Sequence, residues 1–243
     1  MKALLSFFTV LPVRGASLEE AAREIHLLPL IGLVTGLPGA ALLLAADVVP
    51  SGVAATLALG AVLLAAGLHH ADGVLDVGDA IMARGSPDRR REVLRDTRVG
   101  IGGLGALFLV YAPTVGALAA LCAGSPGRAA LALFAGEVST RSAMLLVLAF
   151  GDPADTRSSS VPFVRALSGS RRSPAVVVAL LAPLPFLLAT SALAPLAILT
   201  APLVALCALR ISAAKFGGIG GDVVGATGEV SRATLLVMLS ATI

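Results

Sequence analysis

The chain has 243 residues, of which 57% are hydrophobic and only 14% are charged. This composition lies far from that of soluble globular domains and excludes a protein whose main solvent is water. The formal net charge of +3 does not indicate a nucleic-acid partner, because the basic residues lie in short polar segments between apolar runs, a placement typical of membrane proteins.

Six apolar runs are each close to the roughly 20 helical residues that cross a hydrocarbon core about 30 Å thick. They cover residues 27–46, 52–68, 100–123, 129–150, 174–189 and 193–209. A shorter run, 235–243, predicts a half-helix, a re-entrant piece or a truncated span. We therefore expect an all-α, polytopic membrane bundle of six to seven transmembrane helices that forms a single domain over residues 1–243.

The Lys and Arg residues predict the orientation of the bundle. They gather before the first run and after the second, fourth and sixth runs, where the last group includes Arg232. These segments all face the same side of the membrane, and cytoplasmic segments retain positive charge. We expect the N-terminus and the long polar segments at the cytoplasmic face of the inner cell membrane.

The polar segment after the second run carries a stripe of carboxylates. Asp72, Asp76 and Asp79 stand at positions i, i+4 and i+7, so on a helix they share one face, with His69 beside it. Such a set repels itself unless a cation binds, and oxygen ligands suit Mg²⁺ or Mn²⁺ better than zinc. A solvated acidic face is the alternative. Beside a bilayer, where ionisable groups are costly, we favour the metal site.

A second stripe follows, made of cations. A serine-proline pair at 86–87 predicts the start of a short helix that runs to about residue 97. On it Arg91, Arg95 and Arg98 repeat the i, i+4, i+7 spacing. Carboxylates for a metal together with guanidinium groups for an anion are what the transfer of a phosphoryl-containing group requires. In the alternative interpretation, these arginines only set the topology and pair with neighbouring acids.

Two further polar patterns lie in the second half of the chain. Inside the fourth run, Glu137 and Arg141 are four apart, which predicts a buried ion pair or a substrate contact by Arg141. Segment 216–232 reads FGGIGGDVVGATGEVSR, a glycine-rich turn whose backbone N–H groups can approach phosphate. Asp222 follows the turn at an N-cap or metal-ligand position, and on a helix it shares a face with Glu229.

Taken in order, these motifs resemble those of the cobalamin synthase family, the adenosylcobinamide-GDP ribazoletransferases. The matching stretches are FFTVLPV at 7–13, PLIG at 29–32, HHADGVLDVGD at 69–79, RDTRVG at 95–100 and GGIGGDVVGA at 217–226. The resemblance implies a magnesium-dependent membrane transferase. Its substrates would be adenosylcobinamide-GDP and α-ribazole or α-ribazole 5′-phosphate, and GMP would be released. An oligomer is compatible with this prediction.

The resemblance and the motifs together give each candidate residue a role. The metal ligands are expected to be Asp72, Asp76 and Asp79, with Asp222 as a further ligand or base and His69 as a second catalytic candidate. Arg95 and Arg98 are expected to stabilise the diphosphate and the leaving GMP. Further substrate-binding candidates are Asp96, Arg141, Gly217, Gly218, Gly221 and Glu229.

Two other classes of protein remain as alternatives. A CDP-alcohol phosphatidyltransferase also uses aspartates at helical spacing around a metal, but Asp76 follows Asp72 and Gly73 too closely for that family's pattern. A small transporter would place ionisable residues within its spans. In this sequence Glu137 and Arg141 alone are expected there.

Overall fold

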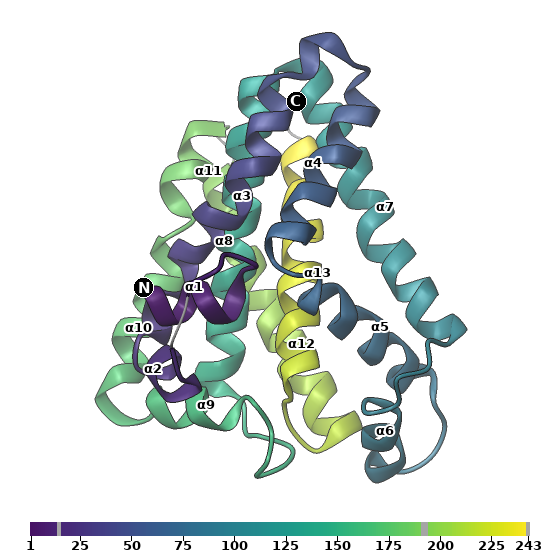
Figure 1. The fold of residues 1–243 in the computed structure, drawn as a ribbon, viewed down its shortest axis with the longest axis vertical. Helices are drawn as coiled ribbons and strands as arrows, with labels where there is room; N and C mark the ends of the chain where they lie inside the picture. The colour runs from purple at the N-terminus through teal and green to yellow at the C-terminus, as the bar shows by residue number, and fades with distance from the viewer. Residues whose placement is uncertain (14–15, 191–193, 242–243) are drawn as a thin grey trace.

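The computed structural model describes residues 1–13, 16–190 and 194–241. Over these ranges the secondary structure is helical, joined by short turns, and it contains no β-strand. Figure 1 shows long helices that run side by side along the longest axis of the molecule. The predicted all-α bundle is therefore confirmed.

The described part of the chain contains thirteen α-helices and four short 3-10 helices, the latter at Ile25–Leu27, Ala46–Val48, Gly169–Arg171 and Ala194–Leu199. The first seven are α1 (Lys2–Phe8), α2 (Leu18–Arg23), α3 (Leu28–Leu44), α4 (Ser51–Ala65), α5 (His69–Met82), α6 (Pro87–Val93) and α7 (Ile101–Gly124). The others are α8 (Pro126–Phe150), α9 (Val161–Ala166), α10 (Arg172–Leu181), α11 (Leu184–Thr190), α12 (Thr200–Phe216) and α13 (Gly221–Ser240).

Within the described ranges, six helical segments are long and apolar enough to span a membrane. They are Ile25–Leu44, Ile101–Gly124, Pro126–Phe150, Gly169–Thr190, Leu196–Phe216 and Gly221–Ser240. The pair formed by α4 and α5 passes the same test but is bent by 95°. The predicted number of six to seven spans agrees with this count, although two of the predicted spans differ in detail.

The second predicted span, 52–68, is shorter than expected because the chain turns before it ends. α4 stops at Ala65, and Gly67 and Leu68 take left-handed backbone conformations with φ of 72° and 60°. Glycine adopts that conformation without steric cost, whereas a leucine there is strained. The turn sends α5, with its aspartates, away from the axis of α4 (Figure 1).

The last span is longer than predicted. The expected half-helix at 235–243 is wrong for the described residues, since α13 begins at Gly221 and extends over 20 residues to Ser240. Glu229 and Arg232 interrupt the apolar pattern of the sequence, but they pair with each other inside the bundle and do not end the helix. Arg232 is therefore not in a cytoplasmic segment. Residues 193 and 242–243, at the ends of two predicted runs, lie outside the described residues.

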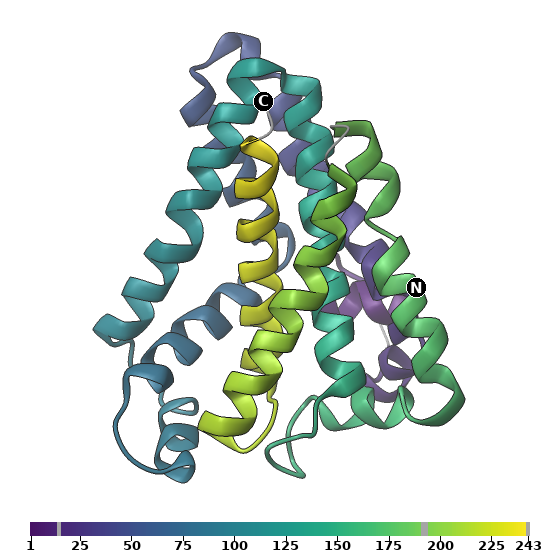
Figure 2. The same cartoon turned by 180° about the vertical axis from the view of Figure 1, so that it is seen from behind.

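The centre of the bundle is α8, whose residues are almost all buried from Ala129 to Ala149. Helices α3, α12 and α13 pack directly against it. Figure 2, a view of the molecule from behind, shows α12 and α13 running beside it. A helix that is buried all round is expected to form a core element rather than a lipid-facing one.

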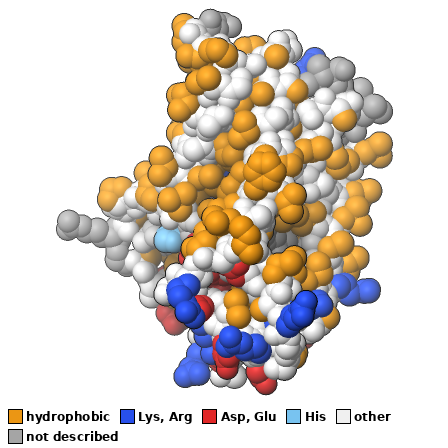
Figure 3. Space-filling model, turned by 90° about the vertical axis from the view of Figure 1, so that its right-hand side faces the viewer, with side chains coloured by type: hydrophobic (Ala, Val, Ile, Leu, Met, Phe, Trp, Pro, Cys, Tyr) orange, Lys and Arg blue, Asp and Glu red, His pale blue; other side chains and the backbone are white. Residues whose placement is uncertain are grey.

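Charged side chains gather at one end of the molecule. In Figure 3 most of the visible Lys, Arg, Asp and Glu side chains lie at the lower end, and hydrophobic side chains cover much of the rest of that face. The same end carries α6, α9, the start of α7 and the turn between α12 and α13 (Figure 1). The polar segments that the sequence assigns to one side of the membrane thus lie together.

Candidate active site

The carboxylates of α5 and α13 come together where the two helices cross. A Cβ atom placed on Gly73 would lie 2.7 Å from the backbone oxygen of Asp222, so the two backbones are in direct contact there. Glycine allows this approach because it has no side chain. As a result, the negative charges of Asp222, Asp72 and Asp79 all act on Asp76, and Asp72 acts on Asp222.

Asp79 also has a structural role at the start of α7. Its carboxylate oxygens accept hydrogen bonds from the backbone N–H groups of Gly100, at 2.7 Å, and Gly103, at 2.8 Å. These groups belong to the first turn of α7, which has no partner for them within the helix. Asp79 therefore fixes the start of α7 against α5 as well as completing the acidic stripe.

The glycine-rich turn is bound to the segment that follows α8. The N–H of Ala154 donates to the carbonyl of Ile219 at 3.0 Å, and the N–H of Ile219 donates to the carbonyl of Asp152 at 2.8 Å. Gly218, with φ of 152°, lies so close that a Cβ would be 2.5 Å from the Asp152 oxygen. This contact brings segment 151–160 over the start of α13.

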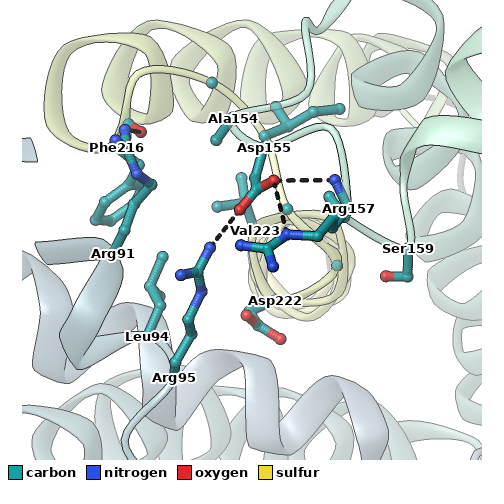
Figure 4. Close-up of a pocket in the computed structure, with 15 residues that line it drawn as sticks. Arg91, Leu94, Arg95, Ala154, Asp155, Arg157, Ser159, Phe216, Asp222 and Val223 are labelled. Atoms are coloured by element: carbon teal, nitrogen blue, oxygen red, sulfur yellow. Dashed lines mark hydrogen bonds and ion pairs between the residues drawn. The ribbon is translucent and has the colours of Figure 1, made fainter. Parts of the chain in front are cut away.

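A polar cavity of about 540 Å³ lies beneath this contact. Its charged lining comes from three parts of the chain: Arg91 and Arg95 at α6, Asp155 and Arg157 after α8, and Asp222 on α13. Asp155 accepts a hydrogen bond from Arg95 at 2.6 Å and one from the backbone N–H of Arg157 at 2.9 Å. Figure 4 shows Asp155 between Arg95 and Arg157, with the Asp222 carboxylate facing the space between Arg95 and Ser159.

The first turn of α13 adds backbone donors to this cavity. Gly220, Gly221 and Asp222 all line it, and no side chain caps the helix at Gly220. The free N–H groups and the dipole of a 20-residue helix favour an anion at this end. With three arginines around it, the cavity has the donors that a phosphate or diphosphate group requires.

A second cavity of about 330 Å³ adjoins the first. Its lining includes Phe7, Phe8 and Phe163 together with His69 and Asp72. The two cavities share three residues of their walls, namely Ser159, Gly221 and Asp222. Asp222 therefore lies where a molecule in one cavity would meet a molecule in the other.

Arg98 and Asp96, two predicted substrate contacts, lie outside both linings. The short helix predicted to residue 97 ends earlier, at Val93, and the Asp96 carboxylate accepts the N–H of Arg98 at 3.1 Å. Such a local turn competes with the helix. Arg98 donates to Asp96, is exposed, and holds the pKa of that carboxyl down at about 2.

Arg141 and Glu229 are buried deeper in the bundle, at about 1% exposure, and line neither cavity. Glu137 lies 4.0 Å from Arg141, so the predicted buried pair is present, but Arg232 is closer to Glu137, at 2.7 Å. Arg232 also pairs with Glu229. The expectation that Glu137 and Arg141 alone are charged within the spans is therefore wrong.

His70 connects this buried network to the second cavity. Arg141 lies 2.7 Å from Nδ1 of His70, and His70 is itself part of the cavity wall. Among the predicted glycines, Gly218 and Gly221 line the polar cavity, whereas Gly217 lies outside that lining, with φ of 74° at the end of α12.

The segment after α8 contributes to the site without a motif in the sequence that indicates it. The sequence places Arg157 among the basic residues that predict orientation, and it gives no role to Asp155 or Ser159. Their only local signal is the density of polar residues in an otherwise apolar chain. The three phenylalanines were also missed, although Phe7 and Phe8 belong to the FFTVLPV motif.

Comparison with known proteins identifies the family. The family model described as cobalamin-5-phosphate synthase matches residues 1–240. A relative from Methanosarcina barkeri named adenosylcobinamide-GDP ribazoletransferase is 32% identical, over 98% of this chain and 90% of its own length.

Relatives of the same name from other organisms match to a similar extent. The one from Azorhizobium caulinodans is 35% identical over 97% of this chain and 92% of its own length. The one from Thermococcus kodakarensis is 34% identical over 99% of this chain and 97% of its own length. No solved structure matches. The chain thus belongs to the cobalamin-5-phosphate synthase family.

Proposed function

We propose that this protein joins adenosylcobinamide-GDP to α-ribazole, or to α-ribazole 5′-phosphate, and releases GMP. The observation that carries the proposal is the pair of adjoining cavities that share Asp222, one lined by arginines and the other by aromatic rings. This arrangement suits a reaction between a diphosphate donor and an acceptor that carries an aromatic base. The family membership favours it over the phosphatidyltransferase and transporter alternatives.

The reaction needs charge stabilisation more than covalent chemistry from the protein. A ribose hydroxyl of the acceptor bonds to the phosphorus nearest cobinamide, the bond from that phosphorus to the bridging oxygen breaks, and GMP leaves with that oxygen. Arg91, Arg95 and Arg157 line the space where the diphosphate would lie and would offset the charge that develops on it. Asp222 or His69 would accept the hydroxyl proton.

The acidic stripe fits a magnesium ion that shares its ligands with the substrate. Among the described residues, no three His, Cys, Asp or Glu side chains lie close enough to hold a metal by themselves. Mg²⁺ is usually bound by one or two carboxylates, waters and substrate phosphates, so a preformed cage is not required. We assign Asp72, Asp76 and Asp222 as its ligands, with Asp79 supporting them. The ion would supply Lewis-acid stabilisation of the phosphoryl oxygens.

The test of this function is the release of GMP by the detergent-solubilised protein. With adenosylcobinamide-GDP and Mg²⁺ present, we expect GMP to form only when α-ribazole or its 5′-phosphate is added. The corrinoid product should appear in equal amount. Release of GMP without an acceptor would indicate a hydrolase, and no release under any of these conditions would refute the transferase.

Arg95 and Arg98 provide a matched pair for testing the diphosphate contact. Lysine keeps the charge but not the planar fork that binds phosphate through two hydrogen bonds. Because Arg95 lines the polar cavity and Arg98 is exposed outside it, we expect Arg95→Lys to lower kcat/KM roughly ten- to a hundredfold. Arg98→Lys should stay within about twofold. Equal losses in both variants would argue against a contact specific to Arg95.

We also propose that the charged end of the bundle faces the cytoplasm. The concentration of Lys and Arg at that end supports this orientation. Ser170 lies before α10 at the charged end, and Ser125 caps α8 at the opposite end. In whole cells, a cysteine at residue 125 should react with a membrane-impermeant thiol reagent, and one at residue 170 should react only after the cells are opened. The reverse pattern would invert the orientation.

A further inference from the structure

Aromatic residues are scarce in this chain, and three of them meet at one place. Phe, Trp and Tyr make up only 4% of the sequence. Phe7 and Phe8 at the end of α1 nevertheless contact Phe163 of α9, with ring centroids 5.5 Å and 6.0 Å from that of Phe163. The rings of Phe7 and Phe8 are 5.0 Å apart and nearly perpendicular. These three side chains, the phenylalanine cluster, come from segments about 155 positions apart in the sequence.

The phenylalanine cluster is not only core packing. Phe8 and Phe163 are buried, but Phe7 is 42% exposed, and all three rings line the second cavity. The imidazole of His70 lies 6.5 Å from the ring of Phe8, which extends the aromatic wall toward α5. A wall of aromatic rings is the kind of surface on which a planar apolar group stacks.

The charges around the two cavities differ in sign. Three arginines line the polar cavity, whereas among the described residues no Lys or Arg lines the second cavity, whose charged residues are Asp72 and Asp222. A diphosphate would therefore find guanidinium partners in the first cavity and none in the second. The donor's nucleotide end therefore belongs in the polar cavity, and the second cavity remains for the acceptor.

We propose that the phenylalanine cluster binds the benzimidazole base of α-ribazole, an assignment that rests on the proposed transferase function. The base is planar, aromatic and apolar, and it would stack on the rings. A corrinoid is too large for a cavity of about 330 Å³, whereas a single nucleoside is of a suitable size. With its base at the cluster, the nucleoside would direct its ribose toward Asp222, the wall shared with the polar cavity.

In this assignment the phenylalanine cluster determines the binding of the acceptor alone. Leucine in place of phenylalanine keeps an apolar side chain and removes the ring. In Phe163→Leu and in the partly exposed Phe7→Leu, we expect the KM for α-ribazole to rise roughly three- to tenfold. The KM for adenosylcobinamide-GDP should stay within about twofold. Phe108→Leu is the control, because Phe108 is 70% exposed on α7 and lines neither cavity.

Two results of this experiment would overturn the inference. A rise in the KM for adenosylcobinamide-GDP alone would mean that the cluster contacts the donor. Unchanged KM values for both substrates would mean that the rings only pack against each other or against lipid. If the wild-type protein released no GMP, the proposed function would fail, and calorimetric binding of α-ribazole would still test the cluster. Weaker binding by Phe163→Leu than by wild type would support it, whereas equal or absent binding would refute it.

Discussion

Asp222→Asn is expected to lower kcat on the order of a thousandfold while the protein still inserts and folds. Asn keeps the size of the side chain but removes the charge that a hard divalent ion or a proton acceptor requires. Asp222 has this importance because it lies in the wall between the two cavities and faces Asp72 and Asp76 across the crossing of α5 and α13. The measurement is turnover of adenosylcobinamide-GDP with saturating α-ribazole.

The same experiment on Asp76→Asn separates metal binding from proton transfer. If Asp76 and Asp222 both hold Mg²⁺, a higher Mg²⁺ concentration should recover part of the activity of Asp76→Asn, since mass action compensates for weaker binding of the ion. Asp152→Asn is the matched control, because its side chain is exposed and lines neither cavity. Wild-type turnover by Asp222→Asn in chelator-treated buffer would contradict both roles of Asp222.

Local patterns in the sequence predicted local structure well. The stripe of Asp72, Asp76 and Asp79 does lie on a helix, α5, and Ser86 does cap α6 by accepting the N–H of Arg89. Both features depend on a few neighbouring residues, whose spacing is visible in the sequence. The extent of α6 was less predictable, because Asp96 forms a turn of its own with Arg98.

The candidate site needed information from distant parts of the chain. Arg95 and Asp155 are 60 positions apart, and the backbone contact between Asp152 and Ile219 that orders this region spans a still longer separation. A hydrophobicity pattern reports where a segment lies relative to the membrane, but it does not report which polar segment folds over which helix. From the sequence, the arginines of both segments can therefore be assigned to one side of the membrane, but it cannot be predicted that they line the same cavity.

The start of α13 illustrates the same limit inside the membrane. Glu229 and Arg232 reduce the hydropathy of residues 221–240, so the apolar run seemed to begin at residue 235. Arg232 is balanced by Glu137, which lies 95 positions earlier in the chain. Charges that neutralise each other inside a bundle are tolerated in a span, and their partners cannot be identified from composition alone.

The buried network is electrically balanced, with Glu137 and Glu229 opposing Arg141 and Arg232 at 1% exposure or less. Thr35 adds a hydrogen bond to Glu137 at 2.6 Å. The network joins three core helices, α3, α8 and α13, and through His70 it reaches the wall of the second cavity. We therefore expect the network to hold these helices in one arrangement beside the two cavities.

Glu137→Leu should destabilise the protein by about 3–5 kcal/mol, because it leaves two buried guanidinium groups facing one carboxylate. Thermal loss of the helical circular dichroism signal in detergent would measure the effect. Glu92→Leu, which breaks an exposed pair with Arg89, is the control and should change stability by about 1 kcal/mol or less. A Glu137→Leu protein as stable as the wild type would show that the network contributes nothing to the fold.

The double variant Glu137→Leu/Arg232→Leu distinguishes a charge imbalance from a packing defect. It removes one carboxylate and one guanidinium and leaves Arg141 opposite Glu229, whose charges already act on each other. Replacing both members of a buried ion pair by apolar residues is often close to neutral, whereas removing one member is not. We therefore expect the double variant to be more stable than Glu137→Leu. If its loss instead equals the sum of the two single losses, Glu137 and Arg232 are not coupled.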